Sequence, residues 1–176
     1  WACDREGAAM KHSEHGASES RNGHEEGRSH YLRFAAMILA SFAAMYVLMY
    51  AMVNAVENAL PNNNQLYMAG LMAAAMAIVE LAIMGGMYPN KKLNLALVGV
   101  SILALAGFWF GLRGQVAISD RQFLKSMIPH HAGAILMCSE AAIQDVEIAQ
   151  LCKSIVSSQQ TEIDQMRTIL ERLGQR

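Results

Sequence analysis

The sequence predicts an all-α protein in which three transmembrane helices precede an antiparallel helical hairpin. The chain has 176 residues, of which 53% are hydrophobic and only 16% charged, and three long stretches within residues 31–112 are almost free of charge. Residues 119–173 instead repeat apolar side chains at helical spacing among polar ones, as helices with one covered face do. The two parts of the chain therefore suit two different environments, a bilayer and water.

Each apolar stretch is long enough to cross a membrane. Residues 34–56 and 93–112 contain no Asp, Glu, Lys or Arg, and residues 66–88 contain one acid. A hydrocarbon core of about 30 Å needs about 20 helical residues, so we expect three spans at these positions and the lipid bilayer as a partner. The third stretch ends in Gly107-x-x-x-Gly111, a spacing that lets helices approach closely.

Residues 1–30 are polar and show no helical or strand period. Such a composition buries little apolar surface, so we expect a disordered tail. The tail holds four of the six histidines of the chain: His12, His15, His24 and His30. These side chains either bind a metal ion loosely or are simply part of a polar tail, and the sequence leaves both readings open.

Basic residues flank the apolar stretches unevenly. The amino tail and the second loop carry them close to the spans (Arg28, Arg33, Lys91, Lys92), whereas the first loop, at 57–65, has neither Lys nor Arg. The positive-inside rule then predicts a cytoplasmic amino tail and second loop and a carboxyl-terminal segment on the outer side of the membrane. The net charge of −1 and the lack of a basic run argue against nucleic acid as a partner.

Residues 113–176 predict two helices joined near residue 144. Ser119 and Gln122 have the spacing of a capping box, and Asp145 is suited to cap the second helix. Two helices of this size bury too little surface to be stable alone. We therefore expect their apolar stripes to pack against a second copy, as a four-helix bundle, or against something else.

Soft donor side chains gather on the first helix of the hairpin. Met127, His130 and Met137 share a stripe, because residues three, four and seven apart lie on one face. His131 is turned from His130 by about 100°, so the two imidazoles should aim at different points. One is expected to serve the ion of the hairpin itself, and the other a second ion or a neighbouring chain.

The second helix brings further donors to the same level of an antiparallel hairpin. Glu162 and Met166 lie opposite the segment that carries Met127. Cys138 and Cys152 also face each other, either as a disulfide in an oxidising compartment or as thiolate donors to a metal. Imidazole and sulfur donors together favour copper, Cu(I) first, with Ag(I) as an alternative.

Two motifs in this segment resemble those of the bacterial "domain of unknown function 305" family. One is Met-Ile-Pro-His-His at 127–131 with a methionine six residues later, and the other is Gln-x-x-Glu-Ile-x-x-Met at 159–166. The match covers residues 119–173, and the three spans resemble the membrane-anchored branch of the family. The resemblance implies a ferritin-like helical fold and periplasmic copper binding linked to metal resistance. The ligands that it implies are Met127, His130, His131, Met137 and Met166, with Glu162 as a further candidate.

Other functions stay open at the level of sequence. The second span carries methionines at four-residue steps around Glu80 (Met68, Met72, Met76, Met84), which suits a copper transporter that passes ions between thioethers as well as ordinary packing. An oligomerising membrane protein without metal is a third reading. A ferritin-like oxidase is less favoured, because the hairpin has no Glu-x-x-His motif. The chain is thus predicted to bind metal ions for sequestration, resistance or hand-over, and not to be an enzyme.

Overall fold

The structure is a computed structural model that describes residues 29–175, and within that range it contains helices and no strand. A first helix at residues 29–48 is followed by η1 (Met49–Met52), η2 (Val56–Asn58), α2 (Asn63–Met84), η3 (Gly85–Met87), α3 (Lys91–Arg113), α4 (Asp120–Glu140) and α5 (Val146–Gly174). The predicted all-α class is therefore confirmed. The predictions for His12, His15 and His24 concern residues outside the described range.

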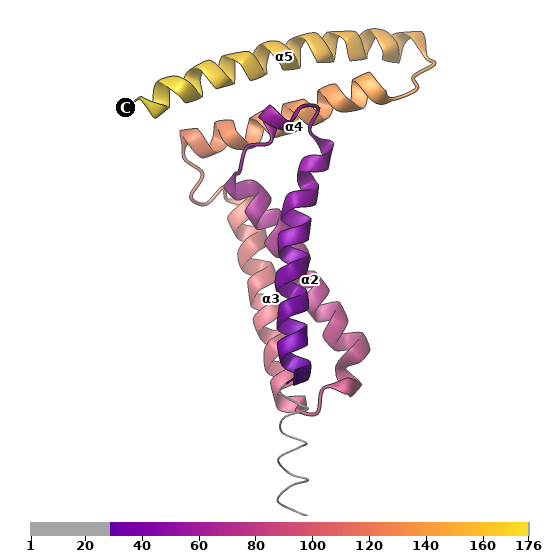
Figure 1. The fold of residues 1–176 in the computed structure, drawn as a ribbon, viewed down its shortest axis with the longest axis vertical. Helices are drawn as coiled ribbons and strands as arrows, with labels where there is room; N and C mark the ends of the chain where they lie inside the picture. Colours follow the sequence, from indigo (N-terminus) through magenta and orange to yellow (C-terminus); the bar gives the residue numbers. More distant parts are fainter. Residues whose placement is uncertain (1–28, 176) are drawn as a thin grey trace, which may run out of the picture.

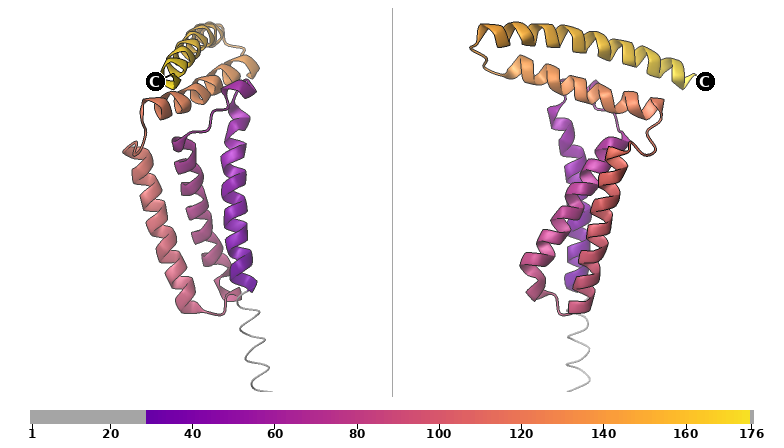
Figure 2. Two further views of the ribbon diagram at one scale, coloured as in Figure 1. Left: turned by 60° about the vertical axis from the view of Figure 1, so that its left-hand side comes forward. Right: turned by 180° about the vertical axis from the view of Figure 1, so that it is seen from behind.

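The helices form two groups that differ in direction (Figure 1). The first helix, α2 and α3 run side by side, and α4 and α5 lie across one end of this bundle as an antiparallel pair. Figure 2 shows that α4 lies between the bundle and α5 in both further views. Helix α4 thus makes the larger part of the contact between the hairpin and the bundle.

Among the described residues, three helices are long and apolar enough to cross a membrane: Ser29–Met52, Asn63–Met87 and Lys91–Arg113. The predicted stretches fall within a few residues of these bounds, except at the first. That helix is already present at residue 29 and the chain leaves it after residue 52, whereas the predicted span was 34–56. Hydropathy locates the part of a helix that suits hydrocarbon, and the polar first turn lies outside that part.

Asparagine side chains begin two of these helices. The Asn62 side chain accepts a hydrogen bond from the backbone N–H of Gln65, and Asn90 accepts from Lys92 and Leu93. Each pairs backbone donors that the first helical turn leaves free. Asn94 Nδ2 donates to Gly85 O at 3.2 Å and to Tyr88 O at 3.3 Å in the short connection between α2 and α3, which are antiparallel neighbours.

Glycines allow α2 and α3 to pack closely, but of the predicted pair Gly107 and Gly111 only Gly111 lies at the contact between the two helices. A Cβ on Gly111 would lie 3.2 Å from the Tyr67 ring, whereas a Cβ on Gly107 would meet no atom within 4 Å. The closest approach is instead at Gly70, where a Cβ would lie 2.6 Å from the ring of Phe108. The Gly-x-x-x-Gly spacing correctly indicates a close contact near the end of α3. It does not predict which aromatic side chain of the other helix packs against each glycine.

The hairpin forms as predicted, with one correction at its start. Asp145 caps α5 by accepting from Ile148 N at 3.0 Å. Ser119 is the residue before α4 but makes no capping hydrogen bond with its side chain. Gln122 Oε1 instead accepts from the backbone N–H of Asn63, 3.1 Å away, at the first turn of α2. The predicted capping box is therefore wrong, because Gln122 joins the hairpin to the bundle.

A small apolar core holds α4 against α5. Its buried members are Ile128, Ala132, Ile135 and Ile163, and partly buried apolar side chains surround them: Val53, Leu60, Val156, Met166 and Leu170. Two of these, Val53 and Leu60, come from the loop between the first two candidate spans. Arg167 adds a hydrogen bond of 2.7 Å to the buried Asn58 in the same loop. The chain itself thus covers part of the surface for which a second copy was expected, and the oligomeric bundle stays a prediction.

The connection between α3 and α4 is held on the first turns of α2. Gln115 and Ala117 have positive φ angles of 49° and 56°, which side chains other than glycine adopt at a cost. Contacts with α2 stabilise this path: Asn63 Nδ2 donates to Ala117 O at 3.1 Å, and Tyr67 Oη donates to Val116 O at 2.7 Å. This junction fixes the angle at which α4 crosses the end of the bundle.

Candidate metal centre

A cavity of about 500 Å³ lies between α4 and the adjoining ends of the first helix and α2. Its lining includes six side chains with sulfur or imidazole donors: Met49, Met52, Met68, Met127, His130 and Met137. Three of them come from the hairpin and were predicted as ligands, and three come from the bundle. The structure therefore gathers the predicted stripe of α4 over methionines of the candidate spans.

Local sequence places this stripe against the bundle. Met127, His130 and Met137 lie on the face of α4 that lines the cavity, together with Pro129, Gly133 and Ala134. At Gly133 a Cβ would lie 3.4 Å from the carbonyl oxygen of Met52, so a small residue lets α4 lie close to η1. On this face of α4, long donor side chains therefore surround the small residues Pro129, Gly133 and Ala134.

The remaining lining side chains are neutral. Asn62, Asn64, Gln65 and Ser126 supply its polar part. Asn62 Nδ2 donates to Gln65 Oε1 at 2.8 Å, and Asn64 Nδ2 donates to Ser126 Oγ at 3.2 Å. None of the described residues that line the cavity carries a carboxylate, although hard cations such as Ca²⁺ and Mg²⁺ prefer oxygen ligands with negative charge. The donor set instead suits a soft cation of low charge.

Two of the other three predicted ligands, His131 and Glu162, meet on the side of α4 that faces α5. His131 Nε2 lies 2.7 Å from Glu162 Oε2, and its Nδ1 lies 2.9 Å from the Met127 carbonyl oxygen. A carbonyl oxygen only accepts, so Nδ1 carries a proton in that contact. Both ring nitrogens are thus engaged, and a metal ion at His131 would have to displace Glu162.

The six predicted ligands are in this way divided between two faces of α4. His130 lines the cavity and His131 contacts Glu162 of α5, so the two imidazoles aim at different points, as the helical twist predicts. His130 is exposed, whereas His131 is 8% exposed. Met166 packs against the hairpin core. The structure joins Met127, His130 and Met137 around the cavity and leaves the others between α4 and α5.

Within residues 29–175, no group of three or more His, Cys, Asp or Glu side chains is placed to hold a metal ion. A centre built from those residue types alone is therefore not formed in this part of the chain. The cavity differs because five of its six donors are thioethers. An ion in this cavity would be bound mainly by methionine, a ligand for Cu(I) and related soft ions.

Sequence reasoning missed Met49 and Met52 as members of this cavity. Both lie in η1, at the end of the first candidate span. The predicted topology could have indicated them, because it places the end of the first span and the start of the second on the same side of the membrane as the hairpin. Met68, assigned to a ladder along α2, is the residue of that ladder that reaches the cavity.

The methionines of α2 do not form a straight column. Each step of four residues advances about 40° around an α-helix, so Met68 and Met84 differ by about 160° in direction. Glu80, the acid within this span, accepts a hydrogen bond from the Tyr88 hydroxyl, with the two oxygens 3.3 Å apart. Glu80 thus has a hydrogen-bond partner within the chain, near the last turn of α2.

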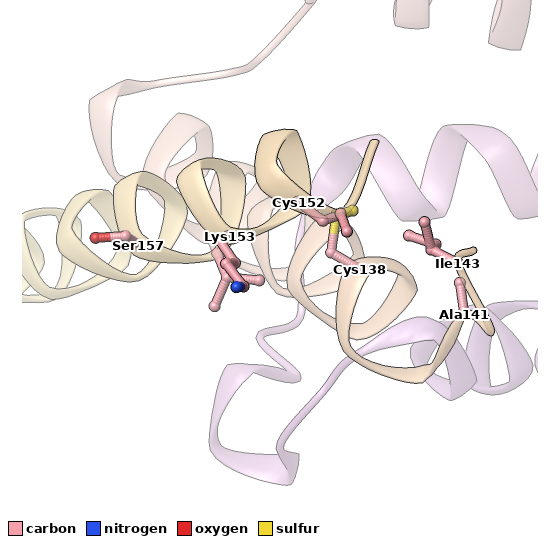
Figure 3. Close-up of a pocket in the computed structure, with 8 residues that line it drawn as sticks. Cys138, Ala141, Ile143, Cys152, Lys153 and Ser157 are labelled. Carbon is pink, nitrogen blue, oxygen red and sulfur yellow. A yellow bond between two sulfur atoms is a disulfide. The ribbon is translucent and has the colours of Figure 1, made fainter. Parts of the chain in front are cut away.

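Cys138 and Cys152 form a disulfide that joins the last turns of α4 to the first turns of α5 (Figure 3). Their Cα atoms are 5.2 Å apart. The predicted opposition of the two cysteines is confirmed. Of the two roles considered, the structure shows the covalent bridge.

Comparison with known proteins places this hairpin in a family. Residues 110–170 match the family described as "Domain of unknown function (DUF305)". An uncharacterized protein of Acanthamoeba polyphaga mimivirus is 34% identical to the chain over 110 residues, which is 61% of this chain and 70% of the viral protein. No solved structure matches. The matched residues contain all of α4 and nearly all of α5, so the chain belongs to the DUF305 family.

Proposed function

We propose that the protein is a membrane-anchored binder of soft monovalent metal ions, Cu(I) first and Ag(I) second. The observation that carries this proposal is the neutral cavity lined by five thioethers and one imidazole. The hairpin supplies Met127, His130 and Met137, and the bundle supplies Met49, Met52 and Met68. The ion is cargo, held for sequestration or for hand-over to another protein.

The chemistry of the donors supports a soft ion over harder ones. Thioether sulfur is uncharged and polarisable, so it favours Cu(I) and gives little stabilisation to Mg²⁺ or Ca²⁺. The exposed imidazole of His130 has no hydrogen-bond partner among the contacts of the described residues, whereas His131 has two. His130 is therefore assigned as a ligand, and His131 with Glu162 positions the backbone of Met127 and holds α5 on α4.

The proposed location is a bacterial inner membrane with the hairpin in the periplasm. The first loop lacks Lys and Arg, and the amino tail and second loop carry them. The disulfide between Cys138 and Cys152 suits an oxidising compartment such as the periplasm. Two independent features, charge and cysteine pairing, thus favour the same side for the hairpin.

A transporter remains the second candidate, because Met68 belongs both to the cavity and to the methionine series of α2. Because the methionines of α2 turn around the helix, they do not form a continuous row of thioethers along which an ion could pass within one chain. Conduction would require neighbouring copies to supply donors on the faces between Met68 and Met84. Binding with release on the same side is therefore the favoured function.

Cu(I) titration of the full chain in detergent tests the proposal. The disulfide is kept oxidised, and the donors of the amino tail are removed by the substitutions His12→Ala, His15→Ala, His24→Ala and Cys3→Ser. Under anaerobic conditions, this chain competes for Cu(I) with a chromophoric chelator. We expect one ion per chain. Outer-shell partners of a metal contribute about 10- to 100-fold to affinity, so the variant Met127→Leu/His130→Ala, which removes direct ligands, should bind about 100-fold more weakly or worse.

Matched substitutions make the outcome specific. His30→Ala alters a histidine at the far end of the first helix, and Met84→Leu alters a methionine at the far end of α2. Both should leave the affinity unchanged. A chain that binds no stoichiometric Cu(I), or that binds it equally well after Met127→Leu/His130→Ala, would contradict the proposed function.

A further inference from the structure

The cysteine pair lies in a pocket of its own at the turn of the hairpin. This open pocket of about 450 Å³ is lined by both cysteines, by Lys153 and Ser157 of α5, and by residues of the turn. Figure 3 shows the sulfur atoms between the two helices, with Ala141 and Ile143 of the turn beside them. The cysteine side chains are half-buried. A small reagent or ion can thus reach the sulfurs without the hairpin opening.

Three features of this cysteine pair are not required for a structural cross-link but suit a metal site. Each sulfur is carried by a regular helix, so the two α-carbons stay 5.2 Å apart by helix packing as well as by the bond. Lys153, a cationic residue of α5, lines the same pocket. Cys138 also follows Met137, a member of the soft-donor cavity, directly in sequence.

We propose that Cys138 and Cys152, once reduced, form a second metal site, in which two thiolates hold one soft monovalent cation such as Cu(I) or Ag(I). A thiol reductant supplies two electrons and two protons, the S–S bond breaks, and the reductant becomes a disulfide. Binding of the cation then forms two metal–sulfur bonds and releases the two thiol protons. Exchange of the two thiols with an external disulfide re-forms the S–S bond, reduces that disulfide to two thiols and closes the site.

The two-coordinate character of this site fits the residues that surround it. Cu(I) and Ag(I) accept two thiolates in a nearly linear arrangement, whereas divalent zinc needs four ligands. No third His, Cys, Asp or Glu is clustered with the pair among the residues that the structure describes. The site therefore discriminates by ligand number as well as by softness. It uses different residues from the thioether cavity, so it does not depend on the proposed function.

Comparing the oxidised and reduced chain measures the proposed site. The full chain with Cys3→Ser is purified anaerobically in detergent, one half is treated with dithiothreitol, and the reductant is removed. Alkylation of the native protein followed by mass spectrometry counts the free thiols, and far-UV circular dichroism checks the helices. Both forms are then titrated with Cu(I) against a chromophoric chelator.

We expect two alkylated cysteines, unchanged helicity and one additional Cu(I) ion in the reduced form. The additional ion should disappear in Cys138→Ser/Cys152→Ser and persist in Met127→Leu/His130→Ala, which separates this site from the cavity. Equal stoichiometry in both redox forms would overturn the proposal, and so would an additional ion that survives the double serine variant. Loss of helicity on reduction, or cysteines that stay unreactive, would show a structural cross-link only and would also overturn it.

Discussion

The two faces of α4 carry neighbouring residues of the same motif but differ in burial and in hydrogen bonding. Toward α5 the helix presents Ile128 and Ala132, both 0% exposed, and His131, whose ring nitrogens are both hydrogen-bonded. Toward the bundle it presents Met127, His130 and Met137 around a cavity. One face is packed and has its polar groups paired, and the other lines a cavity with sulfur and imidazole donors.

This difference assigns separate tasks to adjacent residues. Packing and paired hydrogen bonds stabilise a helix that would otherwise be marginal, so the face toward α5 determines whether the hairpin forms. Exposed imidazole and thioether groups add little stability but remain available to an ion. Substitutions on the first face should therefore act on unfolding, and substitutions on the second should act on binding.

The largest effect is expected from Ile128→Ala. Truncating a fully buried isoleucine leaves a cavity and costs about 2–5 kcal/mol. Unfolding of the full chain in mixed micelles of increasing SDS content, followed by circular dichroism, should show the loss. Met137→Leu, on the cavity face of the same helix, should change the unfolding free energy by less than about 0.5 kcal/mol. Similar losses for the two variants would remove the distinction between the faces.

Reduction of the disulfide should have the next largest effect on stability. The bridge closes a loop between cysteines 14 residues apart, and a loop of about that length is worth about 3 kcal/mol in the chain-entropy model. The helices should remain folded in detergent but unfold at a lower SDS fraction after dithiothreitol. The variant Cys138→Ser/Cys152→Ser supplies the control, because its unfolding should not respond to the reductant. A wild-type chain equally indifferent to reductant would show that the bridge is absent.

A smaller effect is expected from Glu162→Gln. This change removes the carboxylate that contacts His131 at 2.7 Å, and because the Glu162 side chain is half-exposed, the cost should be about 1 kcal/mol of unfolding free energy. Cu(I) affinity should fall by about tenfold at most, the lower range for a residue that acts behind the ligands. Glu171→Gln, an exposed acid farther along α5, is the control. A loss of about 100-fold in affinity would instead make Glu162 a ligand.

Much of the helical architecture was predictable because its signals are local. Apolar length located the three candidate spans, Asp145 marked the start of α5, and counting from the turn placed Cys138 opposite Cys152. The 100° twist between adjacent helical residues separated His130 from His131. Each of these inferences needs only the period of one helix or the register of one hairpin.

What the sequence did not reveal depends on contacts between distant segments. Gln122 pairs with Asn63 rather than with Ser119, and Val53 and Leu60 cover the hairpin core from a loop with no periodic pattern. The inclusion of Met49 and Met52 in the cavity follows from these contacts, because they set where α4 lies on the bundle. No spacing rule within one element can predict such an arrangement.

The central claim is that the hairpin and the bundle share one soft-metal site. Its most direct test is the Cu(I) affinity of the oxidised full chain after Met49→Leu/Met52→Leu/Met68→Leu, which keeps apolar volume but removes every donor that the bundle contributes to the cavity. We predict one ion bound at least about 100-fold more weakly than in the parent chain, a loss of about 2.7 kcal/mol. An affinity equal to that of the parent would contradict the claim and leave the hairpin as the whole site.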